Sequence, residues 1–174
     1  MFQYFKNKKL RKSRAVDMYN EIVQAARQPV FYQEFSIPDT VDGRFEMIAL
    51  HSYIMTHRLN RMGEMRTAQK LFDVMFVNID RTLREMGIGD LAVPKHMKRM
   101  MQGFNGRCVS YEKALGNQED MKQALVRNAY GTVGAPFDHV MDGLIEYIEC
   151  SCAIDSLETV FAPLSAPKDL KQYA

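Results

Sequence analysis

One segment, residues 71–90, constrains the fold of this chain more than any other. Its sequence, LFDVMFVNIDRTLREMGIGD, places an apolar residue at every third or fourth position and then ends in Gly-Ile-Gly-Asp. Apolar side chains at that spacing lie along one face of an α-helix, and a glycine directly after the last apolar position is typical of a helix C-terminus. The segment therefore predicts a long amphipathic helix that ends near Gly87, with Asp90 as the N-cap of the next helix.

Similar patterns predict helices along most of the chain. The expected ranges are residues 13–28, 40–62, 65–86, 94–115, 118–130 and 137–161. The last range is apolar on more than one side, which is typical of a central helix, and no segment shows the alternating pattern of a strand. The predicted fold class is all-α, a single-domain bundle of about six helices.

Residues 29–43 predict a long ordered loop. Their sequence, PVFYQEFSIPDTVDG, contains two prolines and three aromatic residues without helical periodicity. Because aromatic side chains favour burial, we expect the loop to pack across the bundle. The domain organisation that follows is a basic, flexible arm over residues 1–12, a helical domain over 13–162 and a loose tail over 163–174.

Charge is distributed unevenly along the chain. Residues 1–28 contain seven Lys or Arg and two acidic residues, whereas residues 131–174 contain two and seven. A dense group of cations can attract ribosomal RNA or anionic lipid, although a solvated tail is an equally common use of such a sequence. The candidates for binding a ribosome or a membrane surface are Lys6, Lys8, Lys9, Arg11, Lys12 and Arg14. Specific DNA binding is not expected, because the basic charge is confined to one end.

The sequence shows no recognisable catalytic device. The four histidines, which include His51 and His57, lack the spacing of metal ligands, and no glycine-rich loop follows a strand. The three cysteines make no disulfide framework, no apolar run approaches the ~20 residues of a membrane span, and no secretory signal is visible. We therefore expect a cytoplasmic protein with no metal and no cofactor.

The charged residues of the 71–90 segment are better explained by structure than by catalysis. Asp73 and Asp80 lie two helical turns apart, about 10 Å, which is long for a shared acid–base site. We expect Asp80 to pair with Arg84, four residues further on, and Asp73 to bond a loop or another helix. Three further residues are expected to brace the bundle through carboxylate partners: Arg44, Arg58 and Arg107.

Methionine is unusually frequent, with 13 in 174 residues. Its side chain is flexible and polarizable, so an exposed methionine cluster suits varied apolar partners. Met97, Met100 and Met101 form the densest cluster and are the candidates for binding an apolar client protein. An ordinary place in the core is an equally good explanation for them.

Several short motifs lie between residues 19 and 130. The strongest are LFDVMFVNID and LREMGIGD within residues 71–90, and another is PDTVDGRFE at residues 38–46. Together these motifs resemble the ubiquinol–cytochrome c chaperone family. The matching positions, candidates for structural or partner-binding roles, are Phe31, Tyr32, Asp39, Asp42, Gly43, Arg44, Phe45, His51, Arg58, Phe72, Asp73, Phe76, Asp80, Arg84, Glu85, Gly87, Gly89, Asp90, Phe104, Gly106, Arg107 and Tyr111.

The resemblance implies a non-enzymatic assembly factor. It implies that the chain binds newly made cytochrome b during assembly of the cytochrome bc1 complex of a respiratory chain, without ATP. Mitochondrial members of this family act with a small partner subunit near the ribosomal exit tunnel. The resemblance also allows peripheral attachment to the cytoplasmic face of the inner membrane. The alternative is a small-ligand-binding protein or an enzyme with a pocket beneath the 29–43 loop.

Overall fold

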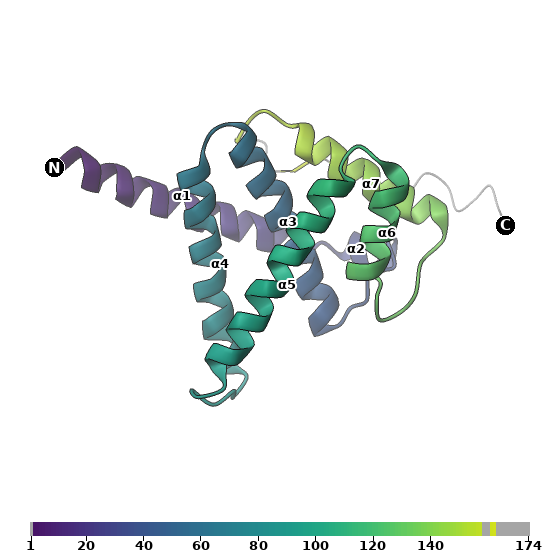
Figure 1. Ribbon diagram of the computed structural model, residues 1–174, viewed down its shortest axis with the longest axis horizontal. Coiled ribbons are helices and arrows are strands. Elements are labelled where there is room, and N and C mark those ends of the chain that lie inside the picture. Colours follow the sequence, from purple (N-terminus) through teal and green to yellow (C-terminus); the bar gives the residue numbers. More distant parts are fainter. Residues whose placement is uncertain (1, 158–160, 163–174) are drawn as a thin grey trace.

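The computed structural model describes residues 2–157, 161 and 162, and within them the chain forms seven helices and no strand (Figure 1). The helices are α1 (Phe2–Ala26), α2 (Pro29–Gln33), α3 (Val41–Arg61), α4 (Met65–Glu85), α5 (Val93–Ala114), α6 (Gln118–Asn128) and α7 (Asp138–Ala153). The predicted all-α, single-domain fold is confirmed. The 29–43 segment differs from its prediction in one respect, because the short helix α2 occupies its first residues.

The central helix of the bundle is α3. It contacts α1, α4, α5 and α7, and every residue from Ala49 to Met55 is buried. Burial on all sides requires that other elements enclose the helix. The prediction of a central last helix is wrong, since α7 packs on α3 and α6 and leaves Glu146 and Cys150 exposed.

The core of the described residues consists of three clusters of apolar side chains. The largest joins α2, α3, α5, α6 and α7, the second joins α1, α3 and α4, and the third lies mainly between α4 and α5. Helix α3 contributes to all three clusters. It therefore fixes the positions of the other helices relative to one another.

Helix α1 begins at Phe2, well before the predicted start at Ser13. Residues 2–12 contain neither glycine nor proline, so nothing interrupts the helix. In Figure 1 the N-terminal end of α1 extends past α4 and away from the rest of the bundle. The basic arm is thus a continuation of the first helix, and its flexibility stays a prediction.

Helix α4 ends as its sequence predicts. Gly87 has a φ of 83°, its N–H donates to the Arg84 carbonyl at 2.9 Å, and the Ile88 N–H donates to the Leu83 carbonyl at 3.1 Å. These two bonds form a Schellman motif. The prediction of Asp90 as an N-cap is wrong, because α5 begins three residues further on and the Asp90 carboxylate accepts a hydrogen bond from Arg84 instead.

Helix α7 ends at Ala153, well before the predicted end at residue 161. Two arginines at the end of α3 explain this. Arg61 donates to the Cys152 carbonyl at 2.8 Å and Arg58 donates to the Ile154 carbonyl at 3.1 Å, which occupies carbonyl groups that a longer helix would use internally. The predicted loose tail, residues 163–174, lies outside the described residues.

Candidate functional site

The motif at residues 38–46 builds the turn into α3. The Thr40 hydroxyl caps the helix by accepting from the Gly43 N–H at 3.1 Å. A Cβ added to Gly43 would lie 2.0 Å from the Pro38 carbonyl oxygen, and Arg44 Nε lies 2.7 Å from Asp39 Oδ1. Gly43 is therefore required by a close approach of two backbone segments.

Gly43→Ala is expected to lower the free energy of unfolding by about 2 kcal/mol, because the new methyl group must displace a backbone carbonyl. Urea denaturation followed by circular dichroism measures this. An unchanged midpoint would show that the turn relaxes at no cost.

The loop is anchored by its aromatic residues, as predicted. Phe31 and Phe35 are buried. The Tyr32 hydroxyl donates to the Ala26 carbonyl at 2.7 Å, and the Tyr130 hydroxyl of the segment after α6 donates to the Phe35 carbonyl at 2.8 Å. The loop is thereby fixed across the bundle.

A cavity of about 480 Å³ lies beside this loop, lined by Arg27, Pro29, Tyr32, Gln33, Asp39 and Arg44. The hydrogen bond from Arg44 lowers the pKa of Asp39, and the same bond raises the pKa of Arg44. Each partner stabilises the charged form of the other, whereas a general acid or base needs a pKa near the working pH. Neither Asp39 nor Arg44 therefore has the pKa that a general acid or base needs.

His51 is buried in a group of aromatic rings. Its Nδ1 lies 2.7 Å from the Met47 carbonyl oxygen and its Nε2 lies 2.9 Å from the Tyr147 hydroxyl. A carbonyl only accepts, so Nδ1 carries the proton and Nε2 accepts from Tyr147. Burial lowers the pKa of His51 to about 4. Both nitrogens are engaged, so His51 holds α3 against α7.

The predicted bracing arginines have different partners. Arg107 of α5 binds the Glu46 carboxylate of α3 through two hydrogen bonds, with Nε 2.5 Å from Oε2, and Arg44 pairs with Asp39. Arg58 donates to the carbonyl oxygens of Ile154 and Ser156, and its predicted carboxylate partner stays a prediction. Its side chain therefore holds the chain that leaves α7.

The Glu46–Arg107 pair is mostly buried. The Glu46 side chain is 8% exposed and that of Arg107 is 24% exposed. Burial raises the pKa of Glu46 in spite of the adjacent guanidinium, while the hydrogen bonds to Glu46 raise the pKa of the less buried Arg107. The cost of desolvation therefore falls mainly on the carboxylate. The guanidinium also lies 5.7 Å from the centre of the Phe45 ring.

The 71–90 motif provides packing and surface ion pairs. Phe72 and Phe76 have ring centres 4.5 Å apart, and Phe104 of α5 lies 6.0 Å from each of them. Arg84 binds both Asp80, as predicted, and Asp90. Among the other matching positions, Asp42, Glu85 and Gly89 are exposed and Tyr111 is buried.

The prediction for Asp73 is wrong. Its carboxylate accepts from Lys70 at 2.5 Å and from Gln69 at 3.0 Å, both on α4. Both partners lie within one helical turn of Asp73, so this carboxylate binds its own helix rather than a loop or another helix.

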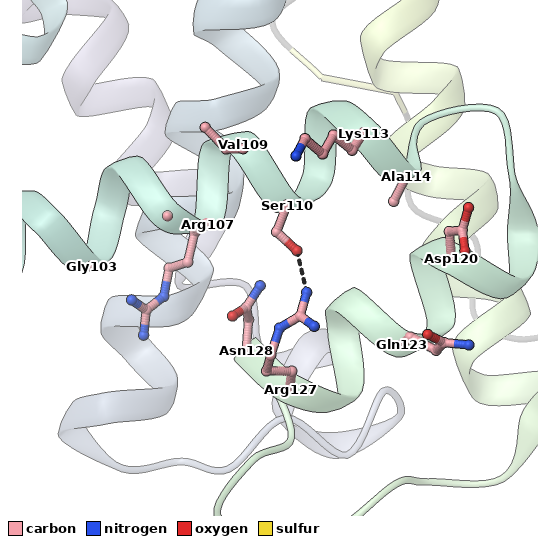
Figure 2. A pocket seen from close by; sticks show the side chains of 11 residues that line it. Gly103, Arg107, Val109, Ser110, Lys113, Ala114, Asp120, Gln123, Arg127 and Asn128 are labelled. Atoms are coloured by element: carbon pink, nitrogen blue, oxygen red, sulfur yellow. Dashed lines mark hydrogen bonds between the residues drawn. The ribbon is translucent and has the colours of Figure 1, made fainter.

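A cavity of about 660 Å³ lies between α5 and α6 (Figure 2). Arg127 of α6 donates to the Ser110 hydroxyl of α5 across it, at 2.6 Å. Gly103 and Gly106 line it from α5. A Cβ added to Gly106 would meet nothing within 4 Å, so this matching glycine, unlike Gly43, is not required by packing within the described residues.

Gly106→Ala is expected to raise the free energy of unfolding by about 0.5–1 kcal/mol, because alanine favours the helical backbone more than glycine does. A thermal melt of the variant beside the wild type tests this. A lower melting temperature would reveal a steric conflict at that surface.

The three candidate methionines Met97, Met100 and Met101 are half-buried and pack against the cluster that contains Phe104. They are neither fully buried nor fully exposed. Their role in binding a client stays a prediction.

A groove of about 810 Å³ lies between α1 and α4, and of the residues that line it only Lys12 and Asp73 were among the predicted sites. It is lined by Lys12, Val16, Tyr19, Asn20, Lys70, Asp73, Val74, Val77, Asn78 and Arg81. The signal in the sequence was the pair Val74 and Val77, which falls outside the main apolar stripe of α4. Val77 is 68% exposed and Val16 is 37% exposed.

The predicted basic residues of α1 are close in sequence to this groove, and one of them, Lys12, lines it. Lys12 and Arg14 are exposed and Arg11 is half-buried. For Lys6, Lys8 and Lys9 the structure describes a helical backbone. Binding of a ribosome or a membrane surface by this segment stays a prediction.

Two features are absent from the residues that the structure describes, a cluster of metal ligands and a membrane-spanning helix. No three His, Cys, Asp or Glu side chains in that part of the chain come together as metal ligands. None of its helices combines the length and apolar character that crossing a membrane requires.

Comparison with known proteins identifies the family. Residues 33–154 match the family model described as ubiquinol–cytochrome C chaperone. The crystal structure of the Cbp3 homolog from Brucella abortus matches with a TM-score of 0.74 and 34% identity, over 90% of this chain and 88% of that one. Comparison with curated proteins gives no match. The chain belongs to the ubiquinol–cytochrome c chaperone family.

Proposed function

We propose that this protein is a non-enzymatic chaperone that binds newly made cytochrome b and holds it during assembly of the cytochrome bc1 complex. The observation that carries the proposal is the family match over residues 33–154, because this range contains the whole of α3 to α7.

Cytochrome b is an apolar membrane protein, so a protein that holds it needs apolar surface accessible to a partner. The α1–α4 groove offers such surface at Val16 and Val77. Holding requires only that the chaperone bind the client and release it to later partners, and therefore no ATP. A small partner subunit of the kind used by mitochondrial relatives is compatible with this mechanism.

The proposed place of action is the cytoplasmic face of the inner membrane, where the client is inserted. Exposed cations on α1, including Lys12 and Arg14, would be attracted to anionic lipid or to ribosomal RNA there. This attraction would concentrate the chaperone where cytochrome b is made.

Affinity purification of the full chain from its native organism tests the proposal, with cytochrome b expressed in one strain and deleted in the other. Immunoblotting should recover cytochrome b with the chaperone from the first strain only. The proposal fails if folded, full-length chaperone recovers no cytochrome b from the expressing strain.

A further inference from the structure

We propose that the α1–α4 groove binds an amphipathic helix of the client whose apolar stripe is flanked by acidic residues. This inference rests on the proposed function, and it adds the surface that recognises the client and the chemistry that is recognised.

Two valines of the groove, Val16 and Val77, are accessible and are not part of the core clusters. Val77 is 68% exposed, whereas Met75 and Ile79 on the other side of α4 are buried in the third apolar cluster. Val16 of α1 is 37% exposed. An apolar helix placed here would bury both valines without disturbing existing packing, which is the usual way in which a helix binds a groove.

The charges of the groove favour an acidic partner. Lys70 is neutralised by Asp73, with Nζ 2.5 Å from Oδ2. Lys12 forms no ion pair within the described part of the chain, and Arg81 donates to the neutral amide oxygen of Asn78. Two positive charges thus remain uncompensated beside the exposed valines, and carboxylates on a bound helix would complement them.

The shape of the groove favours a helix over a bilayer. The groove is concave and is lined by residues of both α1 and α4, which contact each other along the bundle. A helix with its side chains is about 10–12 Å across and convex, so it can contact residues from both α1 and α4. A flat membrane surface would contact only the most exposed residues of the groove.

Fluorescence anisotropy with synthetic peptides tests the proposal on the full-length protein. The probe is a labelled helix of about 18 residues, five turns, with a leucine stripe flanked by glutamates. A matched peptide has lysines in place of the glutamates. We expect the glutamate peptide to bind the wild type at least about tenfold more tightly than the lysine peptide.

Matched variants locate the binding. Val77→Asp should weaken the glutamate peptide by about tenfold or more. Val109→Asp, at a 54% exposed valine of α5 beside the other cavity, should leave the Kd within about twofold. Lys12→Glu combined with Arg81→Glu should reverse the preference between the two peptides. Thermal melts by circular dichroism establish that each variant is folded.

Two results overturn the groove proposal. The first is equal binding of the glutamate peptide by Val77→Asp and Val109→Asp. The second is a wild type that binds phosphatidylglycerol vesicles but not the glutamate peptide, together with a Lys12→Glu/Arg81→Glu variant that no longer binds the vesicles. That result would assign the groove to a lipid surface.

The groove proposal and the proposed function fail separately. If Val77→Asp recovers as much cytochrome b from cells as the wild type does, the groove proposal fails and the proposed function stands. If the wild type recovers none, the proposed function fails, and the peptide titration still decides whether the groove binds an acidic amphipathic helix.

Discussion

Replacing Arg107 with methionine is expected to lower the free energy of unfolding at pH 7 by about 3 kcal/mol. The substitution leaves the Glu46 carboxylate, which is 8% exposed, without the guanidinium that binds both of its oxygens. Removing one partner of a buried ion pair costs this much because the remaining charge stays desolvated. Urea denaturation at fixed pH measures the loss.

The loss should depend on pH in a defined direction. Burial already raises the pKa of Glu46 in the wild type, and removing Arg107 raises it further. A carboxyl group with a raised pKa in the folded state destabilises the fold above that pKa and ceases to do so once it takes up a proton. The difference between the variant and the wild type should therefore shrink as the pH falls from 7 toward 5.

Two controls separate charge from packing. The Glu46→Met/Arg107→Met double variant removes both charges and should lie within about 1 kcal/mol of the wild type. Arg127→Met removes an exposed arginine that bonds Ser110 and should change the free energy of unfolding by less than about 0.5 kcal/mol. If Arg107→Met has as small an effect as Arg127→Met, the pair between α3 and α5 contributes little to stability.

The helices themselves could be predicted from local sequence patterns. The Schellman end at Gly87, the cap at Thr40 and the Asp80–Arg84 pair each depend on residues within a few positions of one another. Such features follow from the geometry of a single helix. The predictions of these features were correct because the features depend only on residues that are close in the sequence.

Some errors, such as those at Asp73 and Asp90, were local. Other errors occurred where distant residues decide the structure. The end of α7 depends on Arg58 and Arg61, which lie more than ninety residues earlier in the chain. The bonds from Arg58 to these carbonyl groups could not be predicted for the same reason. The central position of α3 depends on how four other helices pack around it, which hydrophobic periodicity within one segment does not determine.

The candidate functional residues also divide into those that a local motif identifies and those that distant parts of the chain bring together. The motifs at 38–46 and 71–90 lie within the range that matches the family, and the described contacts of Gly43, Phe72 and Arg84 are structural. The α1–α4 groove was missed, because it combines residues of two helices that are not adjacent in the sequence. The same helix α4 therefore carries the packing residues of the motif on one face and lines the groove with another.

The free energy of unfolding of the wild type is expected to fall by up to about 3 kcal/mol between pH 6.5 and pH 4, because of His51. Burial lowers the pKa of His51 to about 4 from an ordinary value of 6.5. Above pH 6.5 the side chain is neutral in both states. Between these values the unfolded chain binds a proton that the folded protein does not, so acidification favours unfolding. Urea denaturation at several pH values measures the slope.

Two variants at the same contact identify the group responsible. His51→Gln removes the titrating ring, and the part of the slope that belongs to His51 should disappear, whatever the stability of the variant at pH 7. Tyr147→Phe removes only the hydroxyl that donates to Nε2, so the buried ring and the slope should remain. A slope that survives His51→Gln would show that other groups cause the acid sensitivity. A slope lost only in His51→Gln would establish that this matching histidine is a neutral element of the α3–α7 contact.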